Sequence, residues 1–90
     1  MKSIFAGLPG RYSILHRLSP DQFVELMRRL MSLRFRMKRI PRRMKLVTES
    51  SSIVVGFDII KMADNLLTEI LKYIRIHGRR PEWILKRLSG

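Results

Sequence analysis

The residues with the clearest chemical potential form a dense basic cluster in the middle of the chain. Between Leu33 and Lys45 the sequence reads LRFRMKRIPRRMK, and no acidic residue lies between Glu25 and Glu49. Seven of these thirteen residues are basic: Arg34, Arg36, Lys38, Arg39, Arg42, Arg43 and Lys45. Confined positive charges repel one another, and a polyanion compensates them because each Lys or Arg beside a phosphate releases a condensed counterion. The cluster therefore predicts contact with a nucleic-acid backbone, and the alternative is a solvated, solubilising face.

The composition of the whole chain also favours an acidic partner. The 90 residues include 19 basic and 7 acidic side chains, which gives a net charge of +12. A second basic patch follows near the end of the chain: Arg79, Arg80, Lys86 and Arg87. Apolar residues at 46% argue against a disordered basic tail. No apolar run approaches the roughly 18 residues that a membrane span needs, so we expect no integral membrane segment.

Arrangements typical of enzymes and metal sites are poorly represented. The chain has no cysteine, and its two histidines, His16 and His77, do not share a spacing that would hold a metal ion. The glycines of Gly7-Leu8-Pro9-Gly10 lack the Lys-Ser/Thr that completes a phosphate-binding loop. We therefore expect no enzymatic activity, no metal and no cofactor.

A helix must precede the basic cluster. Ser19 can cap it, Pro20 suits its first position, and Gln22 completes a capping box. One apolar face then follows at helical spacing, formed by Phe23, Leu26, Met27 and Leu30. The pattern predicts that this helix ends near Ser32.

Within the cluster the spacing changes to a period of two. Leu33, Phe35 and Met37 alternate with Arg34, Arg36 and Lys38, which predicts a strand over residues 33–38. The three cations would then form a row on the outer face, about 6.6 Å apart, a spacing close to the phosphate repeat of nucleic acid. The competing interpretation is one long helix that continues to Arg39, because Leu, Arg, Met and Lys are good helix formers.

Two more strands and two helices are predicted after the Ile40-Pro41 break. The strands are residues 44–48 and 53–57, joined by a polar turn. Asp58 is a candidate N-cap for a long amphipathic helix that ends at Gly78, and Pro81 opens a short final helix. The expected fold is α+β: a helix, a three-stranded antiparallel meander, a long helix and a short helix. The alternative is an all-α, three-helix protein with a long basic first helix.

The chain is expected to be a single domain over residues 1–90, with residues 1–18 as an N-terminal arm. Tyr12, Ile14, Leu15 and Leu18 can form a short helical turn that packs on the core. An acid-poor, Arg-containing start is also typical of a mitochondrial presequence, which is the second interpretation of this segment. The apolar face of the Ile59–Ile74 helix is wider than three strands require, which favours a homodimer as one way to cover it.

The predicted order of helices and strands resembles that of double-stranded-RNA-binding domains, and the resemblance is limited to this order. The turn here is Ile40-Pro41-Arg42-Arg43 and the long helix opens Asp58-Ile59-Ile60-Lys61, so the glycine-proline turn and lysine cluster of those domains are absent. No residue role follows from this similarity. An aromatic stacking platform is not expected either, because Phe35, Tyr73 and Trp83 are predicted to face the core.

These observations together predict a small basic, regulatory, intracellular protein of the cytoplasm, nucleoid or nucleus. It would contact the phosphate backbone of duplex RNA or DNA with little sequence specificity. One alternative is an adaptor or chaperone-like protein that docks an acidic partner protein. A second is a basic protein directed to the mitochondrion or to a membrane.

Overall fold

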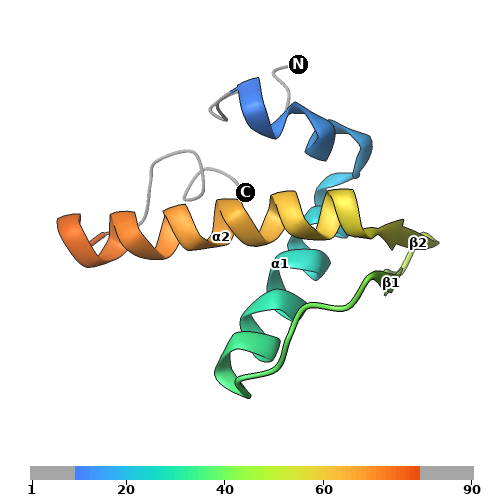
Figure 1. Cartoon of the computed structure of the whole chain (residues 1–90). Coiled ribbons are helices and arrows are strands. Elements are labelled where there is room, and N and C mark those ends of the chain that lie inside the picture. The colour runs from blue at the N-terminus through green and yellow to red at the C-terminus, as the bar shows by residue number, and fades with distance from the viewer. Residues whose placement is uncertain (1–9, 80–90) are drawn as a thin grey trace.

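Two crossing helices, a β-hairpin and a short 3-10 helix make up the fold (Figure 1). A computed structural model describes residues 10–79, and all structural statements below concern these residues. In chain order the elements are η1 (Gly10–Arg17), α1 (Pro20–Phe35), β1 (Arg43–Val47), β2 (Ser52–Gly56) and α2 (Phe57–His77). The protein is therefore a small α+β fold, and the all-α alternative is wrong because a hairpin is present. The predicted final helix, with Trp83, lies outside the described residues.

The start of α1 confirms the predicted capping box. The Ser19 hydroxyl accepts a hydrogen bond from the main-chain N–H of Gln22 at 3.2 Å, and the Gln22 side chain accepts one from the Ser19 N–H at 2.8 Å. The Gln22 amide also donates to the Ser51 hydroxyl at 3.0 Å. One buried side chain thus both begins the helix and ties it to the turn of the hairpin.

The strand predicted over residues 33–38 is wrong, because α1 continues to Phe35. Two main-chain bonds then close the helix: the Met37 N–H donates to the Arg34 carbonyl at 3.0 Å, and the Lys38 N–H donates to the Leu33 carbonyl at 2.8 Å. This pair defines a Schellman motif, in which the residue after the C-cap adopts a left-handed conformation that glycine usually supplies. Here Met37 supplies it, with φ of 56°.

The sheet is an antiparallel hairpin of two strands, so the three-stranded meander is not confirmed. Register pairs Met44 with Val55 and Leu46 with Ile53. Met44 and Leu46 are buried while their neighbours along β1 are exposed, as expected where one face of a strand packs on helices. Because residues 10–79 contain two strands and not three, the order of their elements does not match that of double-stranded-RNA-binding domains.

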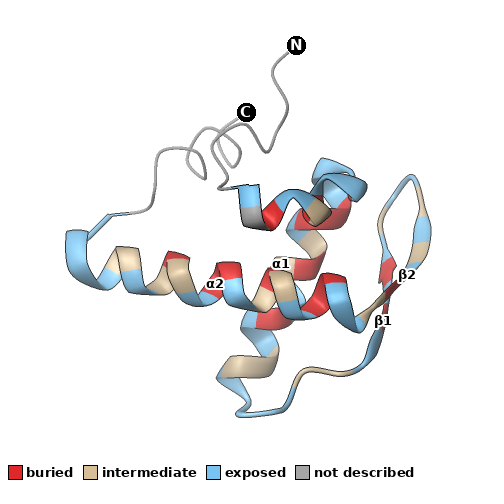
Figure 2. Ribbon diagram, turned by 45° about the horizontal axis from the view of Figure 1, so that its top comes forward, coloured by how far each residue is buried: buried red, intermediate tan, exposed pale blue. Residues whose placement is uncertain are grey.

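The long helix α2 forms the centre of the packing. It contacts α1, η1 and both strands (Figure 2), and its buried side chains are Ile59, Ile60, Ala63, Leu66, Leu67 and Ile70. Gly78 ends it with φ of 70°, as the sequence predicts. Asp58 is not its N-cap: the helix begins after Gly56, and Asp58 instead accepts a bond from the next main-chain N–H, that of Ile59.

The 3-10 helix η1 completes the core from the other side of α2. Its Tyr12 and Leu15, together with Leu18 just after it, are buried in the same apolar cluster as the two long helices. Residues 10–18 therefore pack on the core, and residues 1–9 of the predicted arm lie outside the described residues. Much of the wide apolar face of α2 is therefore covered by the chain itself, and the homodimer stays a prediction.

Candidate nucleic-acid interface

The predicted row of Arg34, Arg36 and Lys38 on one strand face is not formed. These residues occupy the last turn of α1, its C-cap and the following turn instead. Because the chain is helical at Arg34 and turns sharply at Met37, the three cations do not line up at a strand spacing. The cations of the basic cluster therefore do not form the single row that the predicted strand would give.

Arg34 is bound within the protein. Its guanidinium donates to the Asp64 carboxylate at 3.0 Å and to the Asp64 main-chain carbonyl at 3.1 Å, and it makes a further short bond to the Thr68 hydroxyl. Its Nε is buried and has no hydrogen-bond partner. This contact links α1 to α2.

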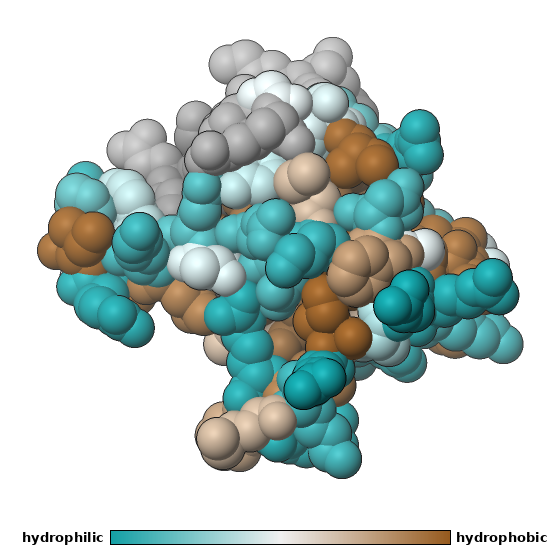
Figure 3. Space-filling model, viewed as in Figure 1, coloured by the Kyte–Doolittle hydropathy of each residue, from teal (hydrophilic) through white to brown (hydrophobic). Residues whose placement is uncertain are grey.

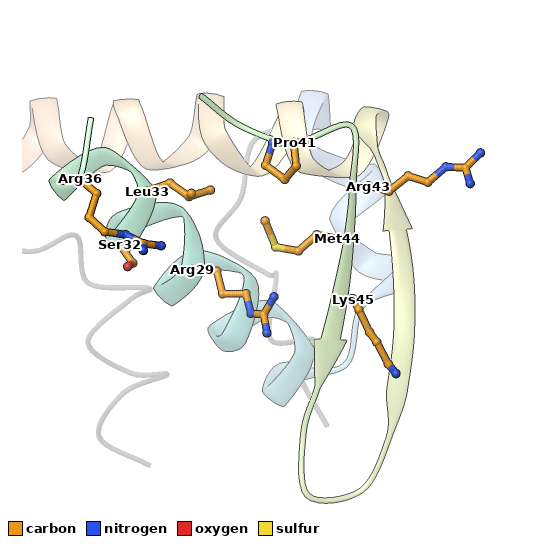
Figure 4. Close-up of a pocket in the computed structure, with 8 residues that line it drawn as sticks. All are labelled: Arg29, Ser32, Leu33, Arg36, Pro41, Arg43, Met44 and Lys45. Carbon is orange, nitrogen blue, oxygen red and sulfur yellow. The ribbon is translucent and has the colours of Figure 1, made fainter. Parts of the chain in front are cut away.

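Three other members of the cluster lie around a groove between the end of α1 and β1 (Figure 4). The groove has a volume of about 320 Å³. Its cationic lining residues are Arg29 of α1, Arg36 at the C-cap of α1, and Arg43 and Lys45 of β1. Two cations thus come from α1 and its C-cap, and two come from β1.

The interior of the groove is apolar. Figure 4 shows the side chains of Leu33 and Met44 pointing toward each other between α1 and β1, with Pro41 beside them. Arg43 extends away from α1 on the outer side of the strand. Met44 and Leu33 thus fill the groove, and the four cations that line it are exposed to solvent.

No acidic residue lines this groove within the described part of the chain. Glu25, four residues before Arg29 in the sequence, is bound by Arg28 at 2.9 Å and by Arg29 at 3.3 Å. Hydrogen bonding from Arg28 outweighs the partial burial of Glu25 and lowers the pKa of its carboxyl below the usual value of 4.5. Glu25 thus pairs with Arg28 and Arg29 and Asp64 pairs with Arg34, while the other cations that line the groove, Arg36, Arg43 and Lys45, have no ion pair with these carboxylates.

The other predicted site residues that the structure describes do not line the groove. Lys38, Arg39 and Arg42 are exposed in the connection between α1 and β1. From the second basic patch, Arg79 is exposed just beyond α2, and Arg80, Lys86 and Arg87 lie outside the described residues. Of the second patch, the structure therefore describes Arg79 alone.

Arg29 and Ser32 line the groove but are not among the site residues predicted from the sequence. Residues 29, 32, 33 and 36 repeat at the spacing of a helix, which places them on one side of α1. This signal was present in the sequence but competes with the period-two alternation over residues 33–38. Only the continuation of the helix to Phe35 decides between the two periods.

The prediction that Phe35 and Met37 face the core is wrong. Phe35 is 91% exposed and Met37 is 92% exposed, because the turn that ends α1 points both side chains away from the body of the protein. Figure 3 shows apolar side chains at the lower extremity of the molecule, over the end of α1 and bordered by hydrophilic ones. An exposed aromatic ring therefore stands beside the basic groove.

None of the helices among residues 10–79 combines the length and the apolar character that crossing a bilayer requires. Comparison with protein-family models finds no match, and comparisons with curated proteins and with solved structures find no significant one either.

Proposed function

We propose that this protein binds nucleic acid by contacting the phosphate backbone along the groove between α1 and β1. The ligand is duplex RNA or DNA, and the role is regulatory, with little sequence specificity. The observation that carries the proposal is the set of cations that line the groove, Arg29, Arg36, Arg43 and Lys45, with no acid among the lining residues in the described part of the chain. Cations gathered around one groove can contact successive phosphates of a nucleic-acid backbone, and each contact releases condensed counterions.

Two further observations support this proposal. Arginine outnumbers lysine among the cations that line the groove, and the planar guanidinium suits two-point contact with phosphate oxygens. The net charge of +12 also attracts polyanions from a distance and speeds their encounter with the protein.

The test is a salt titration with a fluorescent 20-base-pair duplex, followed by anisotropy between about 50 and 200 mM KCl. The variant Arg36→Gln/Arg43→Gln/Lys45→Gln removes three of the charges that line the groove. If each contacts one phosphate, the slope of log K against log salt falls by about 2–3. The matched control Lys61→Gln/Lys72→Gln/Arg75→Gln removes the same charge from exposed positions of α2 and leaves most of the slope.

Two results would contradict the proposal. A flat salt response of the wild-type protein would exclude binding through phosphate contacts. Equal losses in the two triple variants would show that net charge, not the groove, attracts the duplex. A stoichiometric complex with an acidic protein that survives nuclease treatment would favour the adaptor alternative instead.

A further inference from the structure

We infer that Phe35 and Met37 form an apolar wedge that enters a base step of the bound duplex. This inference rests on the proposed function and adds a contact with the bases to it. Both side chains are more than nine-tenths exposed, at the extremity formed by the end of α1. Exposed single apolar residues are common, but an exposed Phe and an exposed Met two residues apart, at a turn, are not explained by packing.

The backbone at this turn supplies a second, independent observation. Met37 holds a left-handed conformation that costs energy for any residue with a Cβ, and glycine would relieve it. The Met37 side chain is 92% exposed, so packing does not explain why a methionine occupies this position. Strained residues of this kind concentrate at functional sites, where the side chain is needed for another reason.

The charges around the end of α1, which carries Phe35 and Met37 and is called the tip below, identify the partner. Arg36, Lys38 and Arg39 are exposed next to the two apolar side chains, and none has an ion-pair partner among the described residues. Apolar groups flanked by cations match a duplex, in which apolar base faces lie between two rows of phosphates.

A wedge fits this tip better than a single-strand stacking platform does. Platforms use several rings on which successive bases stack, whereas the tip presents one ring and a flexible thioether. Phe and Met are both among the side chains that architectural proteins insert between base pairs to unstack a step. The groove cations would then hold the backbone while the tip opens the stack.

The experiment uses the full chain and a duplex with 2-aminopurine, whose fluorescence rises when the base is unstacked. Wild-type protein is expected to raise this fluorescence, and Phe35→Ala/Met37→Ala to abolish the rise and weaken duplex binding about tenfold. The salt slope is expected to stay unchanged, because no phosphate contact is lost. The matched control is Ile76→Ala, which truncates a 68% exposed apolar side chain of α2 and leaves both readouts unchanged.

The outcomes separate this inference from the proposed function. Absence of salt-dependent duplex binding by the wild type ends both. Normal binding with no fluorescence rise, or with the same affinity in the double variant, overturns the wedge alone. Two other results would also overturn it: loss of affinity confined to single-stranded oligonucleotides, and weakened binding only to phosphatidylserine–phosphatidylcholine vesicles, which would assign the tip to an anionic membrane surface. Circular dichroism of the double variant checks that it is folded.

Discussion

The guanidinium of Arg34 joins α1 to α2 through Asp64, at 3.0 Å to the carboxylate and 3.1 Å to the main-chain carbonyl. These residues are thirty positions apart in the chain. The contact takes one cation out of the basic cluster and uses it to fix the angle between the helices that support the groove. Arg34 therefore has a structural role, while the cations on either side of the groove stay exposed.

Removal of this contact is expected to destabilise the fold. Arg34→Ala and Asp64→Ala should each lower the free energy of unfolding by about 1–2 kcal/mol, because a charged hydrogen-bond network that is partly shielded from water is lost. Urea denaturation measures the two single variants and the double variant. Their combined effect should be smaller than the sum, since both changes remove the same contact. Arg36→Ala, at the exposed C-cap, should change stability by less than about 0.5 kcal/mol.

Met37→Gly is expected to stabilise the protein and weaken its binding. Glycine adopts the left-handed backbone at φ of 56° without a Cβ clash, which should raise the free energy of unfolding by about 0.5–1 kcal/mol. Phe35→Gly is the matched comparison: it places glycine at a helical position two residues earlier and should be destabilising. Thermal denaturation of the two variants measures whether each is more or less stable than the wild type. A loss of stability in Met37→Gly would show that the methionine side chain contributes to the fold.

Leu15→Ala tests whether the segment before Ser19 is part of the folded domain. Leu15 is fully buried, so its truncation should cost about 2–5 kcal/mol of unfolding free energy. Ser13→Ala, on an exposed position of η1, is the control and should be close to neutral. A small effect of Leu15→Ala would mean that η1 docks weakly, as expected for a removable leader rather than for an element of the core.

The ion pairs of Glu25 predict an acid-sensitive contribution to stability. Arg28 and Arg29 lower the pKa of Glu25 in the folded state, so the ionised carboxylate is favoured by folding. This contribution is fully present above the usual value of 4.5 and is lost as the pH falls through the lowered folded-state pKa. The stability difference between wild type and Glu25→Gln should therefore shrink below about pH 4.5. A difference that is constant from pH 7 to pH 3 would contradict the pairing.

Several elements of this protein can be predicted from local signals in its sequence. The capping box of Ser19 and Gln22 acts over three residues, Gly78 supplies its own left-handed C-cap, and the β-branched run after Ser52 favours a strand. The alternation of Met44 and Leu46 with exposed neighbours likewise sets which side of β1 faces the helices. In each case the physical preference belongs to residues that are adjacent or one turn apart, so a single sequence contains it.

The tertiary structure alone decided where α1 ends and what its basic residues do. The period-two alternation over residues 33–38 and the helical spacing of 29, 33 and 36 are both present, and local preferences do not choose between them. The contact of Arg34 with Asp64 on α2 favours a helix that continues to Phe35. Met37 occupies the left-handed position where glycine usually marks the end of a helix, so the sequence does not signal that α1 ends there. The basic groove follows from that choice, because its two walls are brought together by packing between α1 and β1, not by spacing along the chain.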